Sequence, residues 1–281
     1  YFLIRGLKPQ WFSKFKNVVV YIGIASYVGT RHGMAAGDHN VLHHITDIKI
    51  PLSQEGIIYR GPANRDIPIP FHTDYGEIIS LYTLSRAASG GNFYLADIHD
   101  IEARISQVRP DIIEELRRPW IMLTLDCSPA PDRVSDERPL LFKLPSGNLA
   151  IQASRARLFG TTTSPRPLSI PPLSAKQIEA IDALHATGQT VAIRFEFRSG
   201  DIFFFNNMRM MHARDGFIDG SEAENTTKRY LVRLILKDER NSSEWEVPPE
   251  METTWKELYD HRDEDEVVSI HEELFSYKAS H

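Results

Sequence analysis

Short apolar runs of strand length recur along the whole chain, and they constrain its fold more than any other feature. Most contain β-branched or aromatic residues and lie close to glycine, proline, asparagine or aspartate, which is typical of β-strands. The predicted strands span 1–7, 17–23, 67–71, 78–84, 92–96, 120–125, 140–144, 191–197, 202–205 and 230–236. We therefore expect a mainly β fold with peripheral helices.

Predicted helices are fewer. The clearest spans 174–187, where Ser174 opens a Ser-x-x-Gln capping box and Gly188 is expected to end the helix. Two shorter helices are expected at 100–108 and 111–118. These segments predict helical decoration around a sheet, not a helical core.

The carboxyl-terminal part of the chain differs in character. From about residue 241 to 281 it is acidic and helix-prone, with a charge run at 260–266, which favours a solvated surface helix or a lid. No internal repeat or low-complexity linker interrupts the sequence. We expect 1–281 to form a single domain, preceded by further amino-terminal residues because the chain opens on a strand-like segment at Tyr1.

Composition excludes several classes of protein. A net charge of -6 without a lysine or arginine cluster argues against nucleic-acid binding. The single cysteine, Cys127, excludes an internal disulfide and a cysteine-rich zinc site. No apolar stretch reaches the roughly 18 residues that span a bilayer. We expect a cytoplasmic protein that binds no membrane; a removed targeting peptide and a homo-oligomer stay open as alternatives.

A histidine and an aspartate follow the extended segment 67–71 two residues apart. In extended chain, His72 and Asp74 point to the same face and can approach one ion. Similar pairs occur at 261–263 and 271–273, but there the chain is predicted to be helix or loop, where such residues diverge. A pair at 72 and 74 is half a metal site, with a hydrogen-bonded surface pair as the alternative.

His212 is the best candidate for the missing ligand. It follows the apolar strand within 201–207, where an imidazole is desolvated unless something pairs with it. The alternative is a core histidine bonded to a backbone carbonyl. Two neutral imidazoles and one carboxylate are typical of non-heme Fe(II) oxygenases, and zinc hydrolases share this set.

Two arginines lie in or directly before the predicted strand at 230–236. Arg229 and Arg233 are four residues apart and are expected to share one face. A buried guanidinium stays charged and usually meets a carboxylate. The partner is either an acidic residue of the chain or a small dicarboxylate, and a zinc hydrolase needs no such cosubstrate.

The order of these motifs resembles that of the TauD/TfdA family of Fe(II)/2-oxoglutarate-dependent dioxygenases, in particular its fungal-type members. The matching pieces are FHTDYG at 71–76, ASGGN at 88–92, RPD at 109–111 with PW at 119–120, the strand 201–207 leading into HAR at 212–214, and RYLVR at 229–233. The resemblance implies a double-stranded β-helix, a jelly roll of the cupin-like kind.

Position by position, the resemblance implies His72, Asp74 and His212 as iron ligands and Arg229 as the residue that holds the distal carboxylate of 2-oxoglutarate. Arg233 falls where some members bind an anionic group of the substrate, although it could equally serve 2-oxoglutarate. Many members carry a second 2-oxoglutarate contact, a threonine, where this chain has Phe93, so Thr83 is the candidate replacement. No catalytic residue is implied beyond the metal centre.

Three further arginines, Arg155, Arg157 and Arg214, are interpreted as surface or scaffold charges, with a place in the substrate pocket as the alternative.

The implied activity converts 2-oxoglutarate and O2 to succinate and CO2 while oxidising a small organic substrate, either an anion or a natural-product intermediate of secondary metabolism. Hydroxylation is the default outcome, and desaturation or cyclisation are variants. The alternatives are a zinc-dependent hydrolase on the same ligands and a non-catalytic jelly-roll binding protein.

Overall fold

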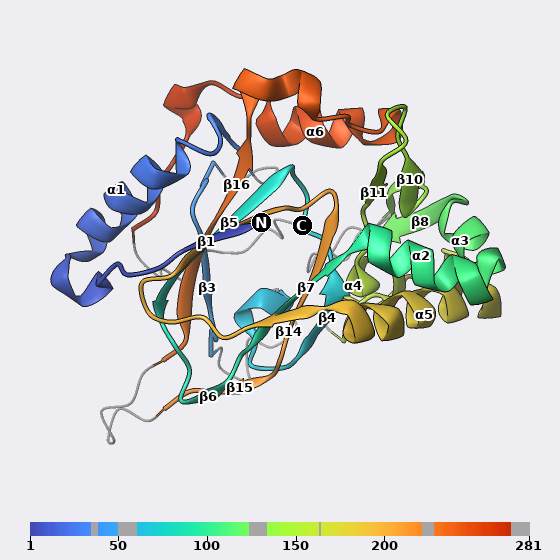
Figure 1. Cartoon of the computed structure of the whole chain (residues 1–281), viewed down its shortest axis with the longest axis horizontal. Helices are drawn as coiled ribbons and strands as arrows, with labels where there is room; N and C mark the ends of the chain where they lie inside the picture. The colour runs from blue at the N-terminus through green and yellow to red at the C-terminus, as the bar shows by residue number, and fades with distance from the viewer. Residues whose placement is uncertain (35–38, 50–60, 124–133, 163, 221–227, 271–281) are drawn as a thin grey trace.

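The computed structural model describes the chain except for residues 35–38, 50–60, 124–133, 163, 221–227 and 271–281. Cys127 and the histidine–glutamate pair at 271–273 lie outside the described residues. Figure 1 shows strands at the centre of the molecule and helices at its periphery. No helix within the described ranges has the length and apolarity that a bilayer crossing requires.

Two antiparallel sheets carry the fold. The larger has the order β1 (Phe2–Ile4), β13 (Ile202–Asn206), β5 (Ile78–Ser85), β16 (Tyr230–Lys237) and β2 (Arg31–His32), with β3 (His43–Thr46) also paired to β16. The smaller has the order β12 (Ile193–Phe195), β7 (Phe93–Asp97), β14 (Met210–Arg214) and β4 (Ile69–His72). Together they form the predicted jelly roll, in which sequence-distant strands become neighbours.

Three short ladders and the helices complete the structure. The ladders are β6 (Ser89–Gly90) with β15 (Phe217–Ile218), β8 (Trp120–Leu123) with β9 (Val134–Arg138), and β10 (Leu141–Lys143) with β11 (Leu149–Ile151). The helices are α1 (Lys14–Ala25), α2 (Ile98–Val108), α3 (Pro110–Leu116), α4 (Arg155–Phe159), α5 (Ala175–Val191) and α6 (Glu252–Tyr259). Short 3₁₀ turns lie at η1 (Pro9–Trp11), η3 (Pro62–Asn64), η5 (Glu239–Glu244), η6 (Pro249–Met251) and η7 (Asp263–Asp265).

Strand β5 shows how the core is built on both faces of the larger sheet. Ile79 and Leu81 pack inward against the aromatic residues of β13, including Phe203. Tyr82 points the other way and packs on Tyr21 of α1, with the two rings 5.3 Å apart. Successive strand residues face opposite sides, and burying each large apolar side chain contributes about 1.5–3 kcal/mol. The run of buried residues along β5 is therefore explained by an apolar layer on each face.

The prediction of a strand at 17–23 is wrong, because this segment forms α1. Its amino-terminal end is capped by Ser13, whose side chain accepts a hydrogen bond from the backbone N–H of Lys16. Val18, Tyr21 and Ala25 are buried on one face. Packing at helical spacing against the sheet outweighs the strand preference of the β-branched residues here.

Two helix predictions also need correction. The capping box of Ser174 is present, but α5 continues through Gly188 to Val191. Gly188 lies against the ring of Phe71, where a Cβ would approach a ring carbon to 3.1 Å, so close packing explains this glycine. Helix α6 is not a solvated surface helix, because its Trp255, Leu258 and Tyr259 are buried.

Candidate metal centre

Two neighbouring strands of the smaller sheet bring the predicted ligands together. His72 ends β4, Asp74 follows it, and His212 lies directly opposite His72 in the register of β4 and β14. One ligand atom from each residue lies within 4.8 Å of the others. His212 therefore stands within a strand of its own, and the cross-strand pairing supplies the third ligand that a single strand cannot.

The state of the two imidazoles suits a divalent metal. The Nδ1–H of His72 donates to the carbonyl of Pro70 at 2.9 Å, which directs the Nε2 lone pair toward Asp74. Burial lowers the pKa of His72 and holds that of His212 well below its ordinary value, so both rings are neutral, as metal ligands must be. The Nε2 atoms of His72 and His212 each lie 3.9 Å from an oxygen of Asp74. These gaps leave room for an ion between them.

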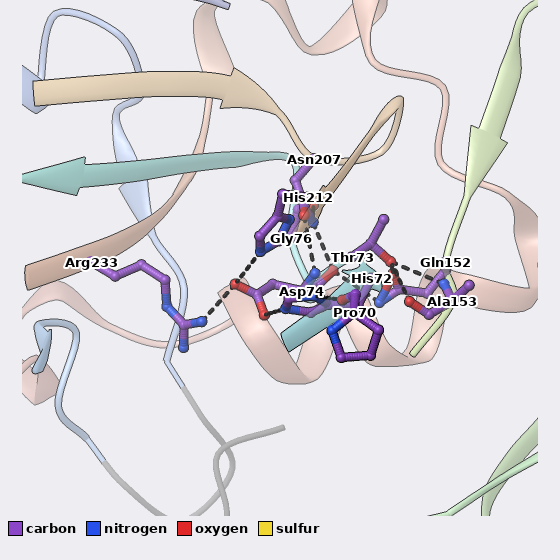
Figure 2. A network of polar contacts seen from close by, with 10 residues as sticks. All are labelled: Pro70, His72, Thr73, Asp74, Gly76, Gln152, Ala153, Asn207, His212 and Arg233. Carbon is purple, nitrogen blue, oxygen red and sulfur yellow. Dashed lines mark hydrogen bonds and ion pairs between the residues drawn. The ribbon is translucent and has the colours of Figure 1, made fainter. Parts of the chain in front are cut away.

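The backbone of the His-Thr-Asp segment is held by two amides that the sequence analysis did not identify (Figure 2). Asn207 donates to the carbonyls of Asp74 and Gly76 at 2.7 and 2.9 Å and accepts from the N–H of Asp74 at 3.1 Å. Gln152 donates to the same Asp74 carbonyl at 2.9 Å. The polar ending of the strand at 201–207 was a signal for Asn207, whereas no local pattern marks Gln152.

Arg233 holds the carboxylate of Asp74. Its Nη1 lies 2.6 Å from Oδ2 of Asp74, and both side chains are largely buried. Figure 2 shows this ion pair on the side of Asp74 opposite Thr73 and Gln152. Of the two partners considered for this arginine, the structure therefore supplies an acidic residue of the chain, and that residue is the expected iron ligand.

Arg229 is in a different state. It precedes β16, instead of lying within it, at the point where the pairing with β5 is irregular. Its backbone N–H donates to Asp219 at 2.7 Å, but its Nη1 is buried without a hydrogen-bond partner among the described residues. Burial, followed by the nearby Arg214, lowers the pKa of Arg229 to about 9. A buried cation with so little compensation fits an anionic ligand.

The glycine pair at 90 and 91 shapes the approach to Arg229. Both glycines have positive φ, 74° and 71°. A Cβ on Gly90 would come within 2.3 Å of the carbonyl oxygen of Gly216. A Cβ on Gly91 would lie 3.4 Å from the side chain of Arg229. The chain can pass this close to its neighbours because these residues lack side chains.

The expected second contact to 2-oxoglutarate remains a prediction. Phe93 lines the cavity beside the metal cluster and stacks on the ring of His212, with centroids 5.5 Å apart. Thr83 is buried on β5, but it is not among the residues that line this cavity. Its hydroxyl has no hydrogen-bond partner in the part of the chain that the structure describes.

A cavity of about 270 Å³ joins these residues. It contains His72, Asp74, His212, Arg229 and Arg233, so the structure brings together all the predicted site residues except Thr83. Arg155, Arg157 and Arg214 also line it.

The alternative histidine pair in the tail is engaged elsewhere: Nε2 of His261 lies 3.1 Å from a carboxylate oxygen of Glu266.

Comparison with known proteins agrees with this geometry. The family model described as "Taurine catabolism dioxygenase TauD, TfdA family" matches residues 2–235. A curated relative, the taurine hydroxylase-like protein SAT17 of Stachybotrys chartarum, is 35% identical over 269 residues, which cover 95% of this chain and 68% of the relative.

Solved structures share the fold at low sequence identity. The non-heme iron oxygenase OrfP in complex with Fe and alpha-ketoglutaric acid has a TM-score of 0.55 and 18% identity, covering 82% of this chain and 68% of its own. An asparagine oxygenase in complex with Fe(II), a 3-hydroxyasparagine and succinate has a TM-score of 0.50 and 16% identity, covering 73% of this chain. The chain spans 59% of the length of that oxygenase.

Proposed function

The chain belongs to the TauD/TfdA family of Fe(II)/2-oxoglutarate-dependent dioxygenases, and we propose that it oxidises a small organic substrate while converting 2-oxoglutarate and O2 to succinate and CO2. The observation that carries this proposal is that one cavity is lined by the His72, Asp74 and His212 cluster and by Arg229, whose buried Nη1 has no hydrogen-bond partner among the described residues. A metal site alone would suit a zinc hydrolase equally well. The arginine supplies the carboxylate-binding position that a hydrolase does not need.

The three ligands would hold iron from one side. His72 and His212 are neutral, and Asp74 contributes the negative charge. Bound there, Fe(II) supplies the activation of O2 that is coupled to the oxidative decarboxylation of 2-oxoglutarate. The role of the protein is to fix these ligands and to place 2-oxoglutarate and the substrate beside them.

Both the backbone and the side chain of Asp74 are held by hydrogen bonds from other residues. Its backbone is held by Asn207 and Gln152, and its Oδ2 by Arg233. Partners of this kind orient a ligand and affect metal affinity by roughly 10- to 100-fold.

Arg229 would bind the distal carboxylate of 2-oxoglutarate. The carboxylate would satisfy the buried Nη1 and neutralise a cation that burial disfavours. Arg233 is occupied by Asp74, which favours Arg229 over Arg233 for this role.

Hydroxylation of an unactivated C–H bond is the reaction we propose, since it requires only that one carbon be placed near the metal and that water be kept away. Desaturation or cyclisation would depend on how the substrate is held after the hydrogen is removed.

Anaerobic titration tests the proposal directly. Purified protein loaded with Fe(II) should develop a visible charge-transfer band when 2-oxoglutarate is added, and exposure to O2 should release succinate in the presence of a substrate acid. A zinc hydrolase would show neither the band nor any need for 2-oxoglutarate, and a binding protein would release no succinate. Either outcome would refute the proposed activity.

A further inference from the structure

The cavity carries far more positive than negative charge. Five arginines line it, namely Arg155, Arg157, Arg214, Arg229 and Arg233, whereas Asp74 is the only carboxylate among the described lining residues. Asp74 is also the expected iron ligand, so it is not available to a substrate. A charge distribution of this kind favours the entry of negatively charged molecules over positively charged ones.

Four of the five arginines already have a role in the structure or in the proposed function. Arg229 would take 2-oxoglutarate, and Arg233 binds Asp74. Arg214 donates to three backbone carbonyls at 3.2, 2.7 and 2.5 Å. Arg155 forms an ion pair with a surface aspartate at 2.6 Å and lies over a phenylalanine ring. Arg157 is the fifth: like Arg214 it has no carboxylate partner among the described residues, but it donates to one backbone carbonyl where Arg214 donates to three.

Arg157 is positioned to bind an anion inside the cavity. Its side chain is buried, and its guanidinium lies over the ring of Tyr75 with the central carbon 4.5 Å from the ring centroid. Nη1 donates to the carbonyl of Leu123 at 3.2 Å, and no carboxylate of the described chain pairs with it. Stacking on an aromatic ring uses one face of the guanidinium and leaves N–H donors at its edge.

Much of the remaining lining of the cavity is apolar. It includes Pro62, Ile67, Pro68, Ile69 and Pro70, and Tyr75 directly follows the expected iron ligand Asp74. A molecule whose acidic group meets Arg157 would therefore place its apolar body near the metal.

We infer that Arg157, stacked on Tyr75, recognises the acidic group of an otherwise apolar substrate. This inference rests on the proposed function and narrows it. An amino acid is disfavoured as a substrate, because its ammonium group would find no free carboxylate among the described lining residues.

The test compares an apolar acid with its uncharged amide and with an amino acid. Calorimetry on the anaerobic Fe(II) enzyme with 2-oxoglutarate bound would measure the affinities of 4-phenylbutyrate, its primary amide and phenylalanine. We expect the acid to bind roughly 10- to 100-fold more tightly than the amide, as the loss of a charged hydrogen bond implies, and phenylalanine to bind no better than the amide.

Variants assign the preference to one residue. Arg157→Gln should reduce the ratio of acid to amide affinity to about one, Arg157→Lys should retain part of it, and Arg155→Gln should leave it unchanged. A merely structural role for Arg157 would lower both affinities together and leave their ratio intact.

The outcomes separate this inference from the proposed function. Absence of the 2-oxoglutarate band would refute the function. A normal band with equal binding of acid and amide, with no binding of the acid, or with an unchanged ratio in Arg157→Gln would overturn the role of Arg157. The comparison within the unmodified protein decides the charge preference even if Arg157→Gln does not fold.

Discussion

Two buried clusters in this molecule contain the same groups, two imidazoles and one carboxylate, yet only one is built to hold a metal. The first comprises His72, Asp74 and His212. The second, the tail cluster, comprises His32, Glu266 and His261 and joins the amino-terminal region to the tail. The side chains of the first cluster are 18%, 10% and 9% exposed, and those of the tail cluster 17%, 13% and 8%. Burial therefore does not distinguish them.

The distances between donor and acceptor atoms do distinguish them. In the tail cluster, the two imidazoles lie 2.8 and 3.1 Å from the oxygens of Glu266, which is hydrogen-bonding distance. In the first cluster, both nitrogen–oxygen distances are 3.9 Å. In the tail cluster each imidazole already has a hydrogen-bond partner in Glu266, whereas in the first cluster the Nε2 atoms of His72 and His212 are too far from Asp74 to bond to it. Among the described residues, only the first cluster brings one ligand atom from each of three residues within 4.8 Å of one another, and this spacing of all three atoms separates a ligand set from a structural network.

The largest expected effect comes from removing a ligand of the first cluster. His72→Ala or His212→Ala should abolish bound iron and reduce succinate production by more than about 100-fold, since changes at outer partners alone cost 10- to 100-fold. Iron content after anaerobic loading and succinate release measure this. His261→Ala, the matched change in the tail cluster, should retain both. Iron lost from His261→Ala and kept in His72→Ala would reverse the comparison.

The next effect concerns the cosubstrate. Arg229→Ala should raise the 2-oxoglutarate concentration needed for half-saturation by roughly 10- to 100-fold, because a buried carboxylate would lose its charged partner. Titration of the visible band measures this directly. Arg155→Ala, which removes another cavity arginine, is the control and should titrate as the unmodified protein does. An unchanged midpoint in Arg229→Ala would move the role to Arg233.

A smaller effect is expected where the backbone of Asp74 is held. Asn207→Ala removes donors to two carbonyls and an acceptor for the N–H of Asp74. Iron affinity should fall by roughly 10-fold, at the lower end of the range for such partners, while the protein stays folded. Competition with an iron chelator measures the affinity. Asn206→Ala is the control, because its side chain bonds to the N–H groups of residues 208 and 209 instead.

How far the sequence predicts this site depends on whether each contact is local. His72 and Asp74 could be placed on one face because they are two residues apart in extended chain. The alignment of His212 with His72 depends on the register of β14 against β4, which no local pattern contains; only the resemblance to a family joined them. Gln152 was missed for the same reason, since its contact with Asp74 depends on how the segment that follows β11 lies against the segment that follows β4.

The difference between local and long-range contacts also explains the errors in the predicted secondary structure. The β-branched run at 18–20 favours a strand locally, but the burial of Tyr21 and Ala25 against the sheet makes the segment a helix. The tail was predicted to be solvated because of its charges, although Trp255 and Tyr259 anchor it to the core. In both places a few long-range packing contacts outweigh a local preference.

The smallest expected effect tests the tail cluster as a purely structural network. Burial by itself would raise the pKa of Glu266, but its bonds to His32 and His261 hold that pKa below its ordinary value. A carboxylate with a depressed folded-state pKa contributes stability above its unfolded pKa of about 4.3, and loses that contribution as the pH falls through the folded pKa. Glu266→Gln should therefore lower the free energy of unfolding by about 1 kcal/mol near pH 7, and the difference should shrink below about pH 4.

Thermal or denaturant unfolding at several pH values would measure this difference. Glu264→Gln is the matched control, because Glu264 is exposed and its salt-bridge partner among the described residues is the exposed Arg262, so its effect should be near zero at every pH. Iron binding should be the same in both variants. A Glu266→Gln variant that loses iron without losing stability would show that the short distances in the tail cluster do not mark a structural network, and spacing would then fail as the criterion that separates the two clusters.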